Sequence, residues 1–247
     1  MTDAELMKRA LDLARKGEGW TTPNPMVGAV IVNGGQVVGE GYHQKAGTPH
    51  AEIHALNMAG DRAKGGTIYV TLEPCCHFGR TPPCTDALIK AGITQVVVAM
   101  TDPNPQVAGE GLKKLQEAGV EVVTGVLEEE ARALNEVFIK HITARRPFVA
   151  LKSALTLDGK TAAKNGSSQW ITGEEARRYV HRLRHKYDAI LVGIGTVLAD
   201  DPLLTTRLPG LKNPVRVVLD SSLRIPLTAR VLDTATGPTL VFTAVNP

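Results

Sequence analysis

One histidine, one glutamate and two cysteines set the strongest constraint on how this chain can fold. His50 and Glu52 are separated by a single residue, Cys75 follows Pro74, and Cys84 comes nine positions after Cys75. One imidazole and two thiolates are a set of three protein ligands that a catalytic zinc site uses when its fourth position is left to water. A fold that uses them must bring three separate segments of the chain to a single point.

The same residues indicate a chemistry. The pattern H-x-E followed by P-C-x-x-C is the signature of zinc-dependent deaminases. Zinc lowers the pKa of its water to about 7, so hydroxide is available at neutral pH to attack a ring carbon. A carboxylate beside the metal can carry the proton from water to the departing ammonia. We therefore predict that His50, Cys75 and Cys84 bind one zinc ion and that Glu52 is the catalytic proton carrier. One departure remains, because eight residues separate the two cysteines where the signature has two.

Two other interpretations use the same site. A structural zinc closed by Cys76 as a fourth ligand would make the chain a binding protein, but it leaves Glu52 without a role and needs two adjacent cysteines on one ion. A cytidine-deaminase-like enzyme acting on another nucleoside or on RNA would share the three ligands. That alternative predicts the short spacing between the cysteines and no second domain.

Apolar periodicity and turn residues predict an α/β chain of two domains, residues 1–145 and 147–247, because a charged stretch ends at Pro147 and a new apolar segment begins at Phe148. Strands alternate with helices in the first domain, which favours a sheet that is largely parallel after an opening hairpin. His50 and Cys84 each open a predicted helix, where the helix dipole stabilises thiolates. The predicted helices are 2–17, 50–63, 84–91, 107–118, 127–142 and 174–186, and the predicted strands are 27–32, 37–42, 67–72, 95–100, 121–124, 148–155, 189–192, 215–219 and 239–242.

Charge and cysteine usage narrow the class of partner. A formal net charge of +3 is too small to predict nucleic-acid binding. No apolar stretch approaches the ~20 residues of a membrane helix, and the polar, acidic N-terminus is unlike a signal peptide. Three cysteines within ten positions favour metal binding or catalysis in a reducing compartment over a disulfide framework. We predict a cytoplasmic enzyme with no nucleic-acid or membrane partner, and a homo-oligomer is left open.

Longer motifs carry a resemblance to one family. These motifs are residues 22–28 (TPNPMVG), 41–43 (GYH), 71–84 (TLEPCCHFGRTPPC), 102–105 (DPNP), 109–111 (GEG), 155–160 (LTLDGK), 168–172 (SQWIT) and 196–202 (TVLADDP). Together they resemble the bifunctional deaminase/reductases of riboflavin biosynthesis, RibD or RibG, over nearly the whole chain. The resemblance implies an N-terminal cytidine-deaminase-like α/β/α sandwich followed by a dihydrofolate-reductase-like α/β segment.

Two consecutive reactions follow from that resemblance. The first is zinc-dependent hydrolytic deamination of 2,5-diamino-6-(5-phosphoribosylamino)pyrimidin-4-one, and the second is NADPH-dependent reduction of the ribosyl group to ribityl. The implied partner is thus a phosphorylated pyrimidine, and the implied cofactors are zinc and NADPH. In the first domain, the residues expected to bind the substrate are Asn24, His43, His77 and Arg80. An amide such as that of Asn24 both donates and accepts hydrogen bonds, although Asn24 could also serve as a turn residue and Arg80 as a solvated surface charge.

The second domain has its own implied residues. Those expected around the phosphorylated ribose are Ser168, Arg184, Leu204 and Arg207, and arginine suits phosphate because it donates in a fork. Those expected around NADPH are Ala154, Trp170, Thr196, Asp200 and Ser221, with Lys152 a further candidate near the reacting sugar. Trp170 could equally be a core aromatic residue.

Two further features bear on the second domain. Gly193-Ile194-Gly195 follows a predicted strand, but Leu198 stands where a dinucleotide-binding fold would have its third glycine, so we do not predict that fold. The chain stops at Pro247, just after a predicted strand. We therefore expect a C-terminally truncated polypeptide with an intact deaminase and an incomplete reductase.

Overall fold

The computed structural model describes residues 1–78, 82–104 and 107–245. They form two compact units, Met1–Val149 and Ala150–Pro247, and each is considered by itself. The domain limits given above remain predictions. None of the described helices has both the length and the apolar character needed to cross a membrane.

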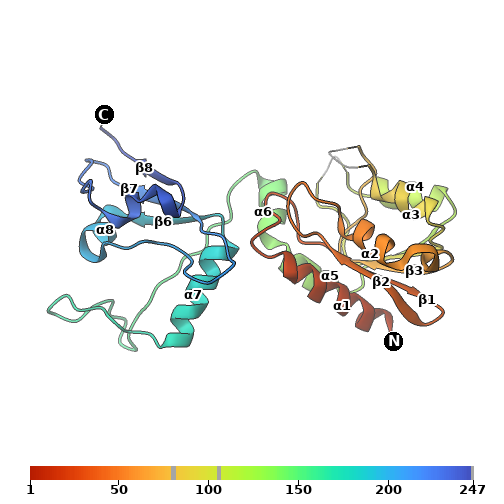
Figure 1. Cartoon of the computed structure of the whole chain (residues 1–247), viewed down its shortest axis with the longest axis horizontal. Helices are drawn as coiled ribbons and strands as arrows, with labels where there is room; N and C mark the ends of the chain where they lie inside the picture. The colour runs from red at the N-terminus through yellow and green to blue at the C-terminus, as the bar shows by residue number, and fades with distance from the viewer. Residues whose placement is uncertain (79–81, 105–106, 246–247) are drawn as a thin grey trace. The chain divides into compact units, whose positions relative to one another are not determined.

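A five-stranded sheet forms the centre of the first unit (Figure 1). The strand order is β2-β1-β3-β4-β5; β1 pairs antiparallel with both β2 and β3, and the sheet is parallel from β3 onward. A largely parallel sheet after an opening hairpin is what the alternation of elements predicts. The strands are β1 (Gly28–Asn33), β2 (Gln36–Tyr42), β3 (Thr67–Val70), β4 (Gln95–Val98) and β5 (Glu121–Thr124).

Helices cover both faces of this sheet. A capping box fixes the start of the first helix, because the Thr2 hydroxyl accepts from the Glu5 amide and the Glu5 carboxylate accepts from the Thr2 amide. The helices are α1 (Asp3–Ala14), α2 (Ala51–Ala59), α3 (Cys84–Lys90), α4 (Glu110–Glu117), α5 (Glu128–Leu134) and α6 (Glu136–Ala144), with 3₁₀ turns η1 (Arg15–Gly17) and η2 (Gly60–Ala63).

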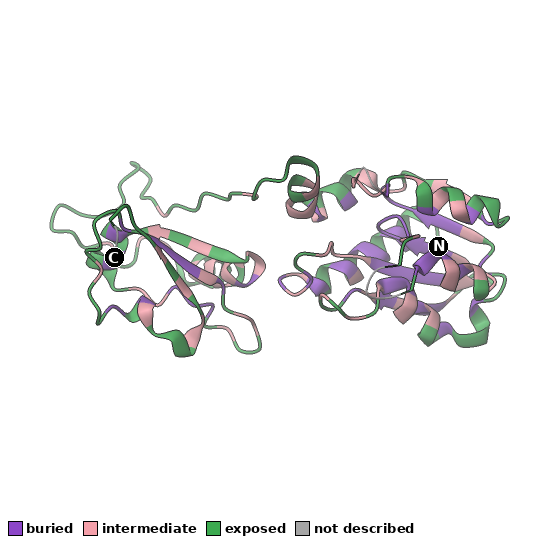
Figure 2. Ribbon diagram, turned by 90° about the horizontal axis from the view of Figure 1, so that it is seen from above, coloured by how far each residue is buried: buried purple, intermediate pink, exposed green. Residues whose placement is uncertain are grey.

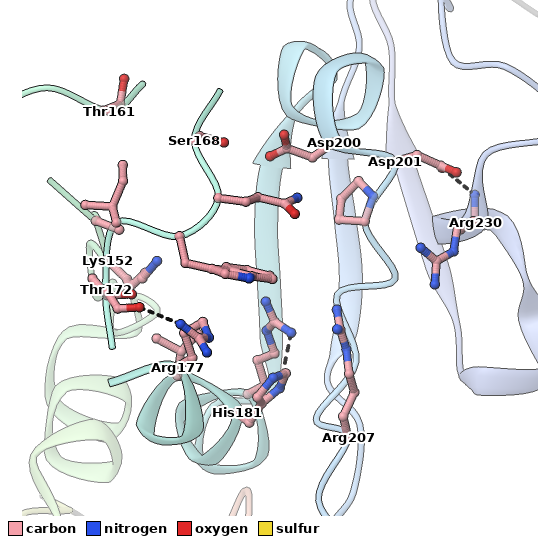
Figure 3. Close-up of a pocket in the computed structure, with 17 residues that line it drawn as sticks. Lys152, Thr161, Ser168, Thr172, Arg177, His181, Asp200, Asp201, Arg207 and Arg230 are labelled. Carbon is pink, nitrogen blue, oxygen red and sulfur yellow. Dashed lines mark hydrogen bonds between the residues drawn. The ribbon is translucent and has the colours of Figure 1, made fainter. Parts of the chain in front are cut away.

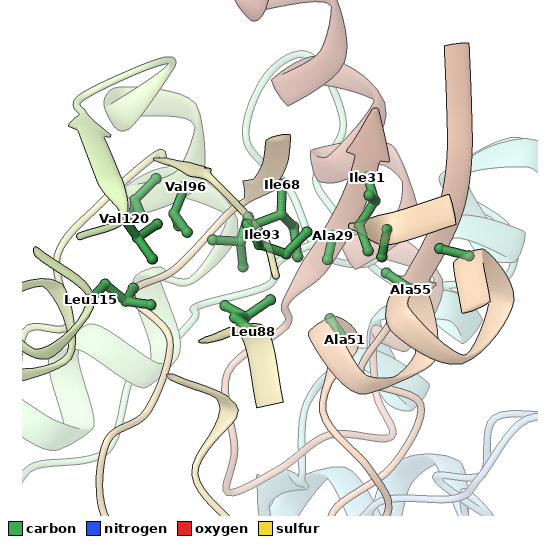
Figure 4. Close-up of a cluster of buried hydrophobic side chains, with 14 of the residues drawn as sticks. Ala29, Ile31, Ala51, Ala55, Ile68, Leu88, Ile93, Val96, Leu115 and Val120 are labelled. Carbon is green, nitrogen blue, oxygen red and sulfur yellow. The ribbon is translucent and has the colours of Figure 1, made fainter. Parts of the chain in front are cut away.

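The alternation of side chains along β1 divides the core into two layers. Ala29 and Ile31 belong to one cluster, with residues of α2, α3 and α4, whereas Val30 belongs to another, with residues of α1 and α5. Figure 4 shows the first cluster, in which Ala51 and Ala55 of α2 approach Ala29 and Ile31. Buried residues are concentrated along the central strands (Figure 2). The unit is therefore an α/β/α sandwich.

Glycines in the hairpin allow α2 to lie very close to β2. A Cβ placed on Gly41 would come within 2.3 Å of the Ala51 carbonyl oxygen and 2.6 Å of the Ala55 nitrogen. Because those neighbours are helix backbone, they cannot move aside as a flexible side chain would. This close approach sets the position of the first turn of α2, where His50 and Glu52 lie.

The second unit contains a smaller sheet. Strands β6 (Ala189–Gly193), β7 (Val215–Leu219) and β8 (Thr239–Phe242) are parallel in the order β6-β7-β8. A small core of apolar residues, including Ile194, Val197 and Val218, lies between β7 and α8. The remaining elements are α7 (Glu174–Lys186), α8 (Ile194–Asp200) and the 3₁₀ turns η3 (Arg230–Leu232) and η4 (Thr234–Thr236).

Two sequence predictions about secondary structure were wrong. The helix predicted over 127–142 is two helices, α5 and α6, which are separated at Asn135 because this residue leaves helical geometry, with φ −104° and ψ 22°. Residues 148–155, which were predicted to form a strand, belong to none of the strands that the structure describes. Most of their apolar side chains are exposed, as in Leu151 at 97%, so apolar character alone did not produce a strand.

The contact at Gly41 makes a testable prediction. Replacing Gly41 with alanine forces α2 away from β2 and is expected to lower the free energy of unfolding of the first unit by about 2 kcal/mol. Gly173→Ala is the control, because a Cβ at Gly173 meets nothing within 4 Å. Urea unfolding followed by Trp20 fluorescence in a Trp170→Phe background would measure the difference. Equal stability of the Gly41→Ala and Gly173→Ala proteins would contradict the packing argument.

Candidate functional site

The predicted zinc ligands meet at the N-terminal ends of two helices. His50 is the N-cap of α2, Cys84 is the first residue of α3, and Cys75 lies in the segment after β3. The His50 Nδ1 atom is 3.2 Å from Cys84 Sγ and 3.5 Å from Cys75 Sγ, and the three ligand atoms all lie within 4.8 Å of one another. The structure thus brings together three residues that the sequence spreads over more than thirty positions.

These distances suit a zinc ion. Bonds of about 2.1 to 2.3 Å to a tetrahedral metal separate its ligand atoms by about 3.5 Å, close to the spacing found here. The donor set of one nitrogen and two sulfurs is also one that zinc prefers. Adjacent Cys76 is not part of the cluster, which leaves three protein ligands in the described site and not the four of a closed structural site.

Hydrogen bonds prepare this cluster for a cation. The thiol of Cys84 donates to Cys75, and the Cys84 backbone amide also donates to Cys75 Sγ at 3.4 Å. These contacts, together with that of His50, lower the pKa of the Cys75 thiol to about 4. The hydrogen bond to Cys75 raises the pKa of His50. The site therefore already favours a thiolate, which is the form that binds metal.

Glu52 lies in the first turn of α2 and is 3% exposed. Burial raises the pKa of its carboxyl group, and the negative charge of Cys75 adds to the shift. The Cys84 side chain lies within hydrogen-bonding reach of this carboxyl group, so Glu52 lies against the metal ligands. A carboxyl group whose pKa is raised holds a proton more readily, and it can both accept and return one.

Asn24 and His43 form a hydrogen-bonded pair beside the ligands. Asn24 Nδ2 lies 3.1 Å from His43 Nε2, and His43 Nδ1 lies 3.2 Å from the Pro49 carbonyl oxygen. The His43 ring stands edge-on to the His50 ring, with centroids 5.5 Å apart. Burial lowers the pKa of His43, which is 2% exposed, so the neutral ring is favoured. Both ring nitrogens of this predicted substrate contact therefore already have partners in the protein.

The loop between the cysteines is described only in part. Arg80 lies outside the described residues, so its predicted contact with substrate phosphate stays a prediction. His77 is exposed and lies near Asp102. Burial raises the pKa of Asp102, whereas the Asn104 amide and the charge of His77 oppose this shift. Asp102 was not among the predicted site residues, although it stands in one of the motifs that carry the resemblance.

A cavity of about 700 Å³ opens in the second unit. Six of the nine predicted reductase residues line it, and so does Lys152 (Figure 3). The six are Ala154, Trp170 and Asp200 from the expected cofactor side and Ser168, Arg184 and Arg207 from the expected substrate side. A cofactor and a substrate that exchange a hydride must lie side by side, so a shared cavity suits both groups.

The remaining three predicted residues do not line the cavity. Thr196 and Ser221 are exposed elsewhere in the unit, and Leu204 is 4% exposed within the small apolar core. The backbone of Leu204 has a positive φ of 56°. Their roles in binding stay predictions.

Positive charge gathers in this cavity. Arg184 donates to the Thr205 carbonyl at 2.8 Å, and its guanidinium lies 3.4 Å from His181 Nδ1. Desolvation, together with the neighbouring charge of Arg207, lowers the pKa of Arg184. No carboxylate forms an ion pair with either arginine among the described residues. An anion would relieve this repulsion, and a phosphate group is the natural candidate.

Among the cavity residues that were not predicted, Arg177 and His181 could have been found from the helix pattern. Arg177, His181 and Arg184 recur at i, i+4 and i+7 on α7, so they share one face of that helix. Arg177 lies over the Trp170 ring at 4.6 Å and donates to the Thr172 carbonyl at 2.6 Å. It thereby supports an indole that is 68% exposed, which argues against a core role for Trp170.

Comparisons with known proteins divide the chain in a similar way. Residues 1–100 match the family described as the cytidine and deoxycytidylate deaminase zinc-binding region. Residues 147–246 match the family described as the RibD C-terminal domain. These matches confirm the predicted fold class, a cytidine-deaminase-like sandwich followed by a dihydrofolate-reductase-like α/β segment.

Similar proteins match nearly the whole chain. The riboflavin biosynthesis protein RibD of Aquifex aeolicus is 58% identical over 98% of this chain and 68% of its own length, and that of Escherichia coli is 52% identical over 94% and 67%. A solved Thermotoga maritima structure, named a diaminohydroxyphosphoribosylaminopyrimidine deaminase/5-amino-6-(5-phosphoribosylamino)uracil reductase, is 49% identical with a TM-score of 0.94, covering 99% of this chain and 70% of that one. The chain thus spans about two thirds of the length of these relatives.

The three-ligand arrangement predicts different outcomes for adjacent cysteines. Cys84→Ser removes a ligand and is expected to lose zinc from the purified protein, whereas Cys76→Ser is expected to keep it. Elemental analysis after dialysis would measure the metal content of both variants. Zinc loss in the Cys76→Ser protein, or retention in the Cys84→Ser protein, would overturn the ligand assignment.

Proposed function

The chain belongs to the RibD family of riboflavin-biosynthesis proteins, and on that premise we propose that its first unit deaminates 2,5-diamino-6-(5-phosphoribosylamino)pyrimidin-4-one. The second unit binds NADPH and the deaminated product and serves the reduction of the ribosyl group to ribityl. The observation that carries the first activity is the convergence of His50, Cys75 and Cys84 on a point beside the buried carboxyl group of Glu52.

Proton transfer is the work of the first unit's own residues. His50, Cys75 and Cys84 would hold zinc, which when bound lowers the pKa of water to about 7 and so supplies the nucleophile. Glu52 accepts the two protons of that water in turn and delivers one to the adjacent ring nitrogen and one to the exocyclic nitrogen, which leaves as ammonia while the ring carbon becomes a carbonyl. The raised pKa of Glu52 suits both halves of this transfer, because the group must hold the proton between the two steps.

Polar side chains around the metal ligands are proposed to orient the substrate. The amide of Asn24 is half-buried next to the ligand cluster, and it can bond an edge of the pyrimidine or a ribose hydroxyl. His77 stands in the loop that begins at Cys75 and is proposed as a further substrate contact. Arg80 in the same loop is proposed to grip the phosphate.

In the second unit the cavity supports reduction. NADPH, when bound, supplies the hydride, and Ala154, Trp170 and Asp200 line the side proposed for it, with Thr196 and Ser221 as further proposed contacts. Arg184 and Arg207 are proposed to hold the phosphate of the ribose, with Ser168 and Leu204 beside the sugar. Lys152 also lines the cavity and is a candidate for contact with the reacting sugar.

The proposed location is the cytoplasm. All three cysteines are free, and two of them are needed as thiolates for the metal. A reducing compartment keeps such thiols from forming disulfides.

Replacing Glu52 with glutamine tests the proton carrier. Glutamine keeps the size of the side chain but cannot carry the proton, so ammonia release is expected to fall by at least about a hundredfold while zinc is retained. Glu117→Gln, an exposed change on α4, is the control and should behave as wild type. Ammonia release can be followed in a coupled assay with the phosphoribosylamino-pyrimidine as substrate. An unchanged rate in Glu52→Gln would exclude the proposed mechanism.

Arg207 tests the anion site of the second unit. Arg207→Gln removes one of two cavity charges to which no described carboxylate is paired, and it is expected to weaken binding of the deaminated, phosphorylated product by roughly tenfold or more. Arg178→Gln is the matched control, because Arg178 is on the same unit but exposed outside the cavity lining. Titration calorimetry would measure both affinities. Equal affinities for the two variants would show that phosphate is bound elsewhere.

A further inference from the structure

Asn135 makes an unusual contact with the loop that carries Asn24. Its side chain is 2% exposed, its Oδ1 accepts from the Met26 amide at 2.8 Å, and its Nδ2 donates to the Met26 carbonyl at 2.9 Å. One side chain therefore pairs with both backbone groups of Met26, as a neighbouring strand would. Asn135 is also the residue at which α5 and α6 separate, so the contact is made from the boundary between the two helices.

The loop needs an anchor of this kind. Pro23 and Pro25 flank Asn24 and have no backbone N–H, so the segment has few donors of its own. The backbone N–H of Asn24 donates to the Thr21 carbonyl at 2.7 Å. This hydrogen bond makes a local turn but does not tie the segment to the rest of the unit. The Met26–Asn135 pair supplies that tie two residues after Asn24.

A second contact fixes which way the Asn24 amide faces. The Pro49 carbonyl can only accept, so the proton of His43 lies on Nδ1 and Nε2 is left as an acceptor. Asn24 must then donate through Nδ2. No described residue hydrogen-bonds the amide oxygen of Asn24, so this oxygen is free to accept a hydrogen bond.

We propose that Asn135 is a positioning residue of the deaminase site, which acts by holding residues 22–27 so that Asn24 presents its amide oxygen to a hydrogen-bond donor of the substrate. His43 is the second positioning residue, since it orients the Asn24 amide and has no nitrogen left for the substrate. The inference rests on the deaminase function proposed above. It assigns a role in that site to a residue about fifty positions beyond the last metal ligand.

Asn135→Asp is the central variant. Aspartate keeps the acceptor for the Met26 amide but places a second oxygen against the Met26 carbonyl, so one arm of the clamp is lost. The KM for the phosphoribosylamino-pyrimidine is expected to rise about tenfold, with a smaller change in kcat and no loss of zinc. Asn33→Asp is the matched control, because Asn33 also donates to two backbone carbonyls, those of Arg62 and Lys64, but at the far end of the hairpin. It is expected to change thermal stability and leave KM unchanged.

A double-mutant cycle separates positioning from a general structural role. If Asn135 acts through Asn24, then Asn24→Ala raises KM by itself and Asn135→Asp adds little in the Asn24→Ala background. A double variant whose KM rises by the product of the two single effects would overturn the proposal. A normal KM in Asn135→Asp, or a normal KM in Asn24→Ala, would also overturn it. Should Asn135→Asp not fold, Asn135→Ser provides the same cycle without a charge.

The wild-type chain is assayed first, so that the two proposals fail separately. Absence of ammonia release by the zinc-loaded wild-type protein would reject the deaminase function itself. Release by the wild type with unaltered kinetics in the Asn135 variants would reject only the positioning role.

Discussion

The first unit depends on the meeting of two helix N-termini at one point. His50 caps α2 and Cys84 begins α3, and each helix is held against the sheet by small or apolar residues at its buried face. Gly41 permits the close approach of α2, and Leu88 of α3 packs in the same cluster. Because helix N-termini favour negative charge, the Cys75 thiolate can lie beside the Cys84 thiol and the buried carboxyl group of Glu52. The residues that pack the sandwich therefore also set the positions of the metal ligands in this unit.

In the second unit it is positive charge that is concentrated, in the cavity. Arg184 and Arg207 lie near each other in a cavity, and no described carboxylate pairs with them. Their repulsion costs stability, and a bound anion would offset it. His181 and the Thr205 carbonyl hold the Arg184 guanidinium in place, so the cavity is organised before a ligand arrives. Such preorganisation lowers the entropy cost of binding.

Sequence reasoning reached the parts of the molecule that depend on local pattern. The bounds of α7, β7 and β8 agree with prediction, because β7 and β8 are short apolar runs and α7 begins after Gly173 with two acidic residues and ends on basic ones. The zinc ligands could be predicted because metal chemistry restricts their residue types. Asn135 could not, since a side chain that binds backbone more than a hundred positions away leaves no local pattern. Local pattern was also misleading for residues 148–155, because their apolar residues favour a strand whereas membership of a sheet is decided by the rest of the fold.

Removal and return of the metal tests the central claim most directly. The full chain would be treated with a chelator, dialysed and assayed for ammonia release from the phosphoribosylamino-pyrimidine, and then assayed again after addition of zinc. We expect the metal-free protein to be inactive and zinc to restore activity as it approaches one ion per chain. Ammonia release by the metal-free protein at the rate of the zinc-loaded one would contradict the assignment of His50, Cys75 and Cys84 as a catalytic metal site.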